Sequence, residues 1–478
     1  MYEKEANTVK VFLDGQMSRR EMLSRLATSG LGAAAVSSIC SNAAQAAFLS
    51  DFDWKKHKGK SIKLLLNKHP YTDAMIARLE EFRQLTGIGA SYDIFPENVY
   101  FEELTAALSL HSDEYDAFMT GAYMTWTYGP AGWVVDHNEW LNDPEKTNPR
   151  YNWFDVLPGV RKSCAWNGQP GGELGSGDAK QWCIPWGYEQ NNLTYNATMF
   201  ERAGVRIPTN LDELTEAAAA VQAGNEGIHG IGLRGTRSWA TIHPGFLSAY
   251  ANFGERDLVL ENGKLKAAMN TRESLAFHTK WVQMIQQSGA RDWSTHTWYK
   301  VREDIGAGRS AMTFDADILG YFANSDENPM SGKLHYAPFA ANHAASAPTP
   351  NIWIWALAMS SFSRNHDATW YFMQWATGPQ FNLDGARNLN FVNPVRRTTW
   401  RDEEFRNGLK TNYPGYVETH DVSVPGASIK FTPQPLFFDL TTEWAASLQK
   451  MVAGKVPVDE GLDQLAESIN TQLEAAGL

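Results

Sequence analysis

The stretch Ile184–Asn196, which reads IPWGYEQNNLTYN, decides how the chain is organised. An apolar and aromatic run ends in Pro185 and Trp186, and a second strand-like run follows at 193–195. Pro185 fixes its φ angle and Gly187 frees it, so the segment can bend while it stays extended. The pattern predicts an extended segment that passes from one packed unit to another. A core strand with a buried tryptophan fits the same residues.

The composition bounds the possible partners of the chain. A length of 478 residues suggests two or three domains, or two lobes of one fold. The formal net charge is −12 and no basic stripe interrupts it, which argues against nucleic-acid binding. The 18 tryptophans exceed what a core usually needs, and aromatic rings also form platforms on which the C–H faces of sugars stack.

The N-terminus has the pattern of an export signal. Arg19 and Arg20 precede a short, mildly apolar stretch, and small residues at Ala44 and Ala46 have the spacing that a signal peptidase uses. This resembles a twin-arginine signal. We therefore predict a signal peptide over residues 1–46, cleavage after Ala46 and a periplasmic address for the remaining protein.

Two cysteines, Cys164 and Cys183, remain after that cleavage. They flank a glycine-rich stretch, and an oxidising compartment favours a disulfide between them, while two buried thiols are the alternative. The sequence contains no CxxC, CxxCH or HExxH motif. We expect neither a metal site nor a cofactor.

The first part of the chain alternates between strand-like and helix-like segments. Strands are expected at 61–66, 90–95 and 115–120, with helices at 73–86 and 101–110 between them. This order is the α/β signature. Ligands of open α/β sheets bind at the carboxyl ends of strands, where His69, Tyr71 and Tyr123 follow the first and third strands.

Two later strands are also followed by polar or aromatic side chains, and a third strand begins with tryptophans. A strand expected at 228–233 leads to Arg234 and Trp239, and a strand at 311–314 leads to Asp315 and Asp317. The strand-like run 353–358 begins with two tryptophans at alternate positions, which place both side chains on one face. The tail 436–478 is mostly helical in pattern.

Several stretches together resemble one family, the bacterial extracellular solute-binding proteins of sugar ABC transporters, which include maltose-binding protein. The quoted strand continues as ATMFERAGVRIPTNLDEL, which is similar to the first crossover of that family and its following helices. GRSAMTFDADILGYF at 308–322 is similar to the segment where the chain crosses back. Residues 356–379 and 393–395 resemble the closing strand and helix and a later proline-containing turn.

The resemblance implies a two-lobe, type II-like periplasmic-binding-protein fold with a ligand cleft between α/β lobes joined by hinge crossings. We expect the N-terminal lobe to contain 47–186 and 312–350, and the C-terminal lobe 187–311 and 351–478. Ligand contacts to both lobes would favour hinge closure. The resemblance also implies delivery of a sugar or sugar alcohol to a membrane permease, without chemistry on the ligand, by a protein that we expect to be monomeric.

Residues at the crossings and strand ends are the candidate ligand contacts. They are His69, Tyr71, Tyr123, Trp186, Glu189, Arg234, Trp239, Asp315, Asp317, Trp353 and Trp355. Carboxylates together with an arginine suit vicinal hydroxyls, which both donate and accept hydrogen bonds. The run Gly232–Gly235 resembles family members associated with polyols, which extends the expected ligands to sugar alcohols.

Structural roles fit several of these residues as well. Asp315 and Asp317 stand where a carboxylate also caps a helix. Trp353 and Trp355 share a face that is either cleft or core. Trp186 would pack beneath the cleft if it lay on the far side of the bend.

Two other function classes use similar residues. A secreted glycoside hydrolase also pairs carboxylates with aromatic rings, and release of sugar from glycosides would identify it. An exported cofactor enzyme is the third class, because twin-arginine export often carries prefolded cofactor proteins. A colourless, metal-free protein would argue against this third class.

Overall fold

A computed structural model describes residues 52–324, 328–339 and 347–478. The predicted signal peptide, residues 1–46, lies outside the described residues and stays a prediction. Within the described ranges, no helix is long and apolar enough to cross a membrane.

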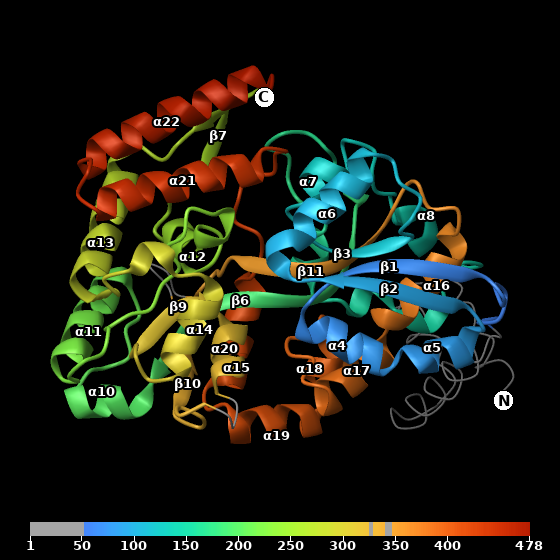
Figure 1. Ribbon diagram of the computed structural model, residues 1–478, viewed down its shortest axis with the longest axis horizontal. Coiled ribbons are helices and arrows are strands. Elements are labelled where there is room, and N and C mark those ends of the chain that lie inside the picture. The colour runs from blue at the N-terminus through green and yellow to red at the C-terminus, as the bar shows by residue number, and fades with distance from the viewer. Residues whose placement is uncertain (1–51, 325–327, 340–346) are drawn as a thin grey trace, which may run out of the picture.

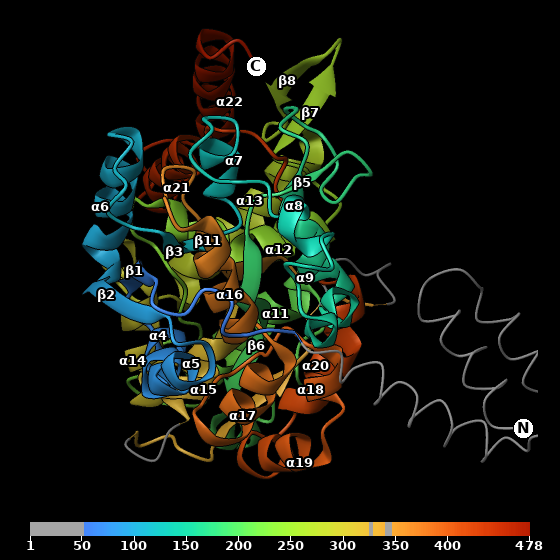
Figure 2. The ribbon, with the colours of Figure 1, turned by 90° about the vertical axis from the view of Figure 1, so that its right-hand side faces the viewer.

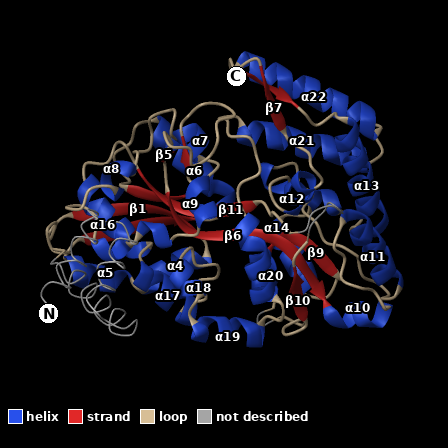
Figure 3. Ribbon diagram, turned by 180° about the vertical axis from the view of Figure 1, so that it is seen from behind, coloured by secondary structure: helices blue, strands red, loops and turns tan. Residues whose placement is uncertain are grey.

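One sheet of seven strands runs through the molecule and gives the strand order β10-β6-β11-β3-β1-β2, with β9 also paired to β6. Figure 3 shows these strands as a band that crosses from one side of the molecule to the other. The strands are β1 (Ser61–Asn67), β2 (Gly89–Phe95), β3 (Ala117–Gly121), β6 (Ile184–Asn196), β9 (Met312–Ala316), β10 (Leu334–Ala337) and β11 (Ile352–Met359).

Strand β6 is the crossing segment, and all of its residues are buried. Its first half pairs antiparallel with β11, from Ile184 opposite Leu357 to Gln190 opposite Ile352. From Asn191 onward it pairs with β9 instead, and its last residues also pair with β10. The predicted passage between two packed units is therefore confirmed, and the change of partner falls between Gln190 and Asn191.

The N-terminal lobe is built on β1–β3, β11 and the first half of β6, and it faces the viewer in Figure 2. The alternation β1, helix, β2, helix, β3 is as predicted, and β1 pairs parallel with both β2 and β3. The helices of this lobe are α4 (Pro70–Ala77), α5 (Leu79–Thr86), α6 (Glu97–Ser109), α7 (Thr125–Tyr128), α8 (Asn138–Leu141), α9 (Pro158–Ser163), α16 (His366–Ala376), α17 (Pro379–Asn388) and α18 (Arg397–Trp400).

The C-terminal lobe is built on β9, β10 and the second half of β6 (Figure 1). It also carries the hairpin of β7 (Leu258–Glu261) and β8 (Lys264–Ala267), whose turn is formed by Asn262 and Gly263. Its helices are α10 (Ala197–Ala203), α11 (Leu211–Ala223), α12 (Gly245–Asn252), α13 (Arg272–Ser288), α14 (Trp298–Gly306), α15 (Asp317–Ala323), α21 (Phe437–Val452) and α22 (Val458–Ala475). Helices α19 (Glu403–Asn412) and α20 (Tyr416–Ser423) contact α17 and β10 respectively and so span both lobes.

The lobe boundaries differ from those expected. Strands β9 and β10, within the segment 312–350, pair with the second half of β6 and belong to the C-terminal lobe. Strand β11 pairs with β3, and α16 packs on β11 and β1, so this part of 351–478 belongs to the N-terminal lobe. The motifs locate the crossings, but the half of β6 that each strand joins is a long-range pairing that they do not encode.

Two local predictions also change. The helix expected at 73–86 is divided into α4 and α5 at Arg78, whose φ of −113° and ψ of 4° interrupt the helix. The strand expected at 228–233 makes only isolated bridges, at His229 and Gly232. Gly230 allows the close approach to α11 there, because a Cβ at this position would lie 2.0 Å from the carbonyl oxygen of Ala218.

The expected disulfide is not formed. Cys164 and Cys183 are buried free thiols. Burial and then a hydrogen bond with Cys183 raise the pKa of the Cys164 thiol well above its ordinary value. Because the thiolate is the reactive species, this environment disfavours the attack that would begin disulfide formation.

Candidate functional site

A small cavity lies where the two lobes meet, and side chains from both lobes line it. Its volume is about 20 Å³, close to the room that one or two water molecules need. The lining residues are His69, Glu97, Glu189, Arg234, Trp239, His243, Trp298, Ile318, Leu319, Trp353 and Trp355.

Strands β6 and β11 form one wall of the cavity. Trp353 lies opposite Glu189 in the antiparallel register, and Trp355 lies opposite Gly187, so the two tryptophans and the carboxyl share a face. The indole N–H of Trp355 donates to Glu189 Oε1 at 2.8 Å. Burial raises the pKa of Glu189 to about 8, although the positive charge of Arg234 acts to lower this pKa. The carboxyl therefore holds a proton at neutral pH and can donate as well as accept.

Aromatic rings from the C-terminal lobe close over this wall. The ring of Trp239 stacks on that of Trp353, with centroids 5.0 Å apart, and on His243 at 5.3 Å. Trp353 Nε1 and His243 Nδ1 are buried and have no hydrogen-bond partner among the described residues. Buried polar atoms are normally paired, so these two are free to bind a ligand.

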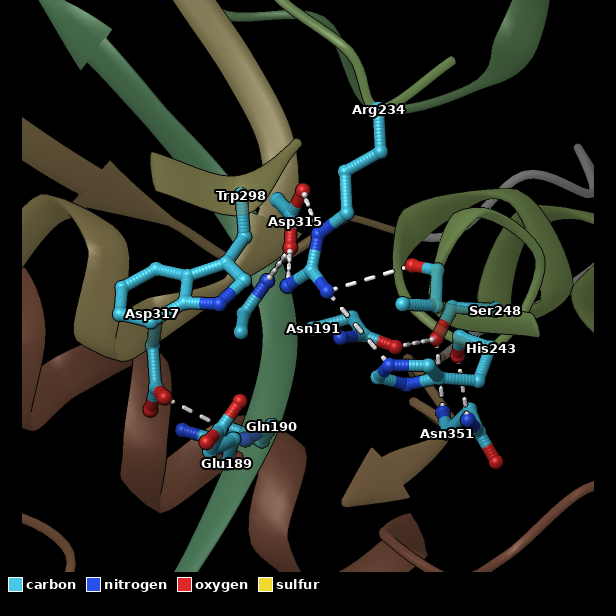
Figure 4. Close-up of polar contacts among 12 residues, drawn as sticks. Glu189, Gln190, Asn191, Arg234, His243, Ser248, Trp298, Asp315, Asp317 and Asn351 are labelled. Atoms are coloured by element: carbon cyan, nitrogen blue, oxygen red, sulfur yellow. Dashed lines mark hydrogen bonds and ion pairs between the residues drawn. The ribbon is translucent and has the colours of Figure 1, made fainter. Parts of the chain in front are cut away.

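Arg234 and Asp315 form a buried ion pair, which Figure 4 shows at the centre of the polar cluster. The Nε atom donates to Asp315 Oδ2 at 2.9 Å and the NH2 group donates to Oδ1 at 2.7 Å. The NH1 group donates to the Ala240 carbonyl and lies 3.5 Å from His243 Nε2. Asp315 does not line the cavity. It holds the guanidinium in place and compensates its charge.

His69 caps the start of α4 and lines the cavity from the N-terminal lobe. Its Nδ1 accepts the backbone N–H of Tyr71 at 3.2 Å, which places the ring proton on Nε2. Burial lowers the pKa of His69 to about 3, so the ring is neutral. The Nε2–H group is thus a fixed neutral donor at the site.

Glu97 and Trp298 link the two lobes at the cavity. Glu97 begins α6 and Trp298 begins α14, and the Trp298 indole N–H donates to Glu97 Oε2 at 3.2 Å. Burial raises the pKa of Glu97. Neither residue was predicted, and neither was His243. Glu97 follows the end of β2 by two residues, but the prediction used only the loops after the first and third strands of this lobe, and Trp298 and His243 lie outside the strand-end loops. The neighbouring aromatics Trp298 and Tyr299 were the only sequence signal at that position.

Tyr71 and Trp186 belong to the core and not to the cavity. The Tyr71 hydroxyl donates to the Val392 carbonyl at 2.6 Å, and its ring occupies the space where a Cβ on Gly187 would lie. Trp186 is fully buried, and its ring centroid is 6.3 Å from that of Tyr71. Trp186 is three positions from Glu189, so alternation along β6 places it on the other face, and the β6–β11 register also shifts at this point, between Trp355 and Ala356.

Tyr123 lies behind the cavity. Its ring stacks between Trp353, at 5.4 Å, and Phe437, at 4.4 Å. Its hydroxyl donates to Asn351 Oδ1 at 3.0 Å, and Asn351 in turn donates to the His243 carbonyl. Tyr123 therefore supports the aromatic wall from behind.

Asp317 is buried beside the cavity but does not line it. Its carboxylate accepts from Asn393 Nδ2 at 2.9 Å, the Tyr416 hydroxyl at 3.1 Å and the backbone N–H of Gln190 at 3.3 Å. Burial raises the pKa of Asp317 to about 7, although these hydrogen bonds act to lower this pKa. Since Gln190 is the last residue of β6 before its change of partner, Asp317 fixes the crossing rather than facing a ligand.

Comparison with known sequences decides the family. The sequence profile of the bacterial extracellular solute-binding proteins matches residues 68–382. The chain belongs to this family. This chain is 36% identical over 453 residues to an erythritol/L-threitol-binding protein of Mycolicibacterium smegmatis. The match covers 92% of this chain and 94% of the relative. The chain is 22% identical over 409 residues to a mannitol-binding protein of Pseudomonas aeruginosa, covering 82% and 87%.

Solved structures confirm the fold of the solute-binding protein. An ABC transporter solute-binding protein from Agrobacterium vitis, solved with bound D-mannitol, superposes with a TM-score of 0.71 at 19% identity. The match covers 88% of this chain and 99% of that one. The two-lobe binding-protein architecture that the sequence motifs implied is therefore confirmed.

Proposed function

We propose that this solute-binding protein captures a short sugar alcohol of the tetritol class outside the cytoplasm and delivers it, unchanged, to the permease of an ABC importer. The observation that carries the proposal is the small cavity between the lobes, enclosed by tryptophans and supplied with hydroxyl-binding groups. The relative named for erythritol and L-threitol supports the ligand class.

The lining chemistry matches a polyol. The rings of Trp239, Trp353 and Trp355 offer flat apolar surface to C–H groups. The Nε2–H of His69 and the unpartnered N–H of Trp353 donate, and Glu189 supplies a carboxyl oxygen. Each hydroxyl of a polyol both donates and accepts, so it can bond to either kind of group.

The size of the cavity favours a short ligand. A volume of about 20 Å³ gives little room in this arrangement, and the aromatic rings must move apart even for a tetritol. An oligosaccharide would require far more separation of the lobes. A tetritol therefore fits the enclosed site better than maltose or a longer saccharide does.

Capture requires contacts to both lobes. His69 and Trp355 come from the N-terminal lobe, whereas Arg234 and Trp239 come from the C-terminal lobe. A ligand held by both sets stabilises the closed state relative to an open one. Export by the twin-arginine route, a periplasmic location and a monomeric state complete the proposal.

A thermal-shift panel tests the ligand class. Residues 47–478 are purified and heated with erythritol, D-threitol, L-threitol, ribitol, mannitol and maltose. A ligand at 100 times its Kd adds about 2.7 kcal/mol of stability, so a tetritol should raise the Tm clearly. Absence of a shift with every polyol would overturn the proposal. Phe154→Ala is the control variant, because Phe154 is an exposed aromatic outside the cavity.

A further inference from the structure

A second and larger chamber adjoins the cavity. Its volume is about 310 Å³, against about 20 Å³ for the inner cavity. It shares Glu97, Arg234, Trp239 and Trp298 with the inner cavity, so these four side chains form the partition between the two spaces.

Trp298 and Glu97 close this partition from opposite lobes. Trp298 begins α14 of the C-terminal lobe and donates its indole N–H at 3.2 Å to Glu97, the first residue of α6 in the N-terminal lobe. The Tyr299 ring stacks on the Trp298 ring, with centroids 3.8 Å apart, and half of Tyr299 is exposed. The indole is thus held on one side by a carboxyl and on the other by a second ring.

The outer chamber has the chemistry to hold a hydroxylated ligand. Phe101 and Tyr299 supply aromatic rings, and the side chains of Thr236 and Ser238 supply hydroxyls. Aromatic rings also line the inner cavity, and hydroxyl groups both donate to and accept from a polyol. A polyol too long for the inner cavity would find suitable partners here if it could pass the partition.

We propose that Trp298, positioned by Glu97, is a specificity-determining side chain that limits the length of the polyol this protein accepts. This inference rests on the proposed function. A longer carbon chain would have to displace the indole and break its hydrogen bond, so the partly buried carboxyl of Glu97 would lose this donor. A tetritol also moves the rings of the inner cavity apart, but it is short enough to leave the Trp298–Glu97 hydrogen bond in place.

Replacement of the ring should therefore join the two spaces. In calorimetry, Trp298→Ala should gain about tenfold or more in affinity for mannitol and maltose, the range by which pocket shape discriminates similar ligands. Its affinity for erythritol should fall by less than about tenfold, because most of the inner lining remains. Trp298→Phe, which keeps a ring but loses the N–H, should retain most of the discrimination, and Glu97→Gln, which keeps an acceptor, should retain nearly all of it.

The controls separate this inference from the proposed function. Trp375→Ala removes a tryptophan that does not line either space and should leave the ligand preference unchanged. If the wild type binds tetritols but Trp298→Ala gains nothing for longer ligands, the length limit is overturned and the proposed function stands. A wild type that binds mannitol as tightly as erythritol overturns it as well. A wild type that binds no polyol overturns both. If Trp298→Ala shows no cooperative thermal transition and is therefore unfolded, Trp298→Leu takes its place, and the gain in affinity for longer ligands is measured on that variant.

Discussion

Trp355 and Glu189 are joined across the β6–β11 pair by an indole N–H that donates to a buried carboxyl oxygen at 2.8 Å. The neighbouring Trp353 has an indole N–H with no partner among the described residues. Two tryptophans that alternate on one strand thus have different tasks. One positions the carboxyl at the crossing, and the other has an unpartnered donor in a side chain that lines the cavity.

This difference predicts different effects for two matched substitutions. Trp353→Phe keeps an aromatic ring and removes a donor that has no partner in the unliganded protein. We expect the Tm of the unliganded protein to fall less than in Trp355→Phe, which loses the same ring volume and a hydrogen bond as well, while the free energy of tetritol binding weakens by about 0.5–1.5 kcal/mol, the typical contribution of one hydrogen bond. Trp355→Phe removes the donor to Glu189 and should lower the Tm of the unliganded protein. Equal effects of both substitutions on the unliganded protein would contradict the assignment.

The Arg234–Asp315 ion pair predicts a large loss of stability when only one partner is removed. Asp315→Ala leaves a buried guanidinium uncompensated, and we expect it to lower the free energy of unfolding by about 3–5 kcal/mol in urea denaturation. The double variant Arg234→Met/Asp315→Leu should recover much of that stability without recovering ligand binding. A single variant as stable as the wild type would show that the pair is not buried as described.

Glu189 predicts a pH dependence of stability. Its pKa rises from the ordinary 4.5 to about 8 in the folded protein. Between these values the folded protein holds one proton more than the unfolded chain, so the free energy of unfolding falls as pH rises, by at most about 1.4 kcal/mol per pH unit. Glu189→Gln should flatten the decline between pH 5 and 8. Glu460→Gln, at an exposed carboxyl, should leave it unchanged. Identical slopes for wild type and Glu189→Gln would contradict the raised pKa.

Asp317 predicts a loss of stability with little loss of binding. Asp317→Ala removes the acceptor for Asn393, Tyr416 and the Gln190 amide, and unpaired buried donors cost about 1–3 kcal/mol. The affinity for a tetritol should change only a few-fold, because Asp317 does not line the cavity. Complete loss of binding in a folded Asp317→Ala protein would return this residue to the set of direct ligand contacts.

Local rules led to much of the candidate site. The rule that ligands lie beyond strand ends led to His69, Arg234 and Trp239, and the alternation along a strand led to Trp353 and Trp355. Glu189 followed from its place in the crossing segment. These six residues do line the cavity. Each of these inferences needs only a short extended segment and the residues directly after it, and the local residue pattern indicates both.

The other assignments depended on pairings over long distances. The face of β6 that carries Trp186 depends on pairing with β11, whose register shifts at this point. Asp317 follows β9 as predicted, but its partner Asn393 lies in the other lobe. Glu97 and Trp298 meet only after the lobes pack, although 201 positions separate them. Nothing near either residue in the sequence indicates the other.

Calorimetric titration of residues 47–478 with erythritol, compared with mannitol and maltose under the same conditions, tests the central claim most directly. We predict saturable binding of one erythritol per chain, with an affinity at least about tenfold higher than for either longer ligand. An absence of heat with erythritol and both threitols, or tighter binding of maltose than of any tetritol, would contradict the account.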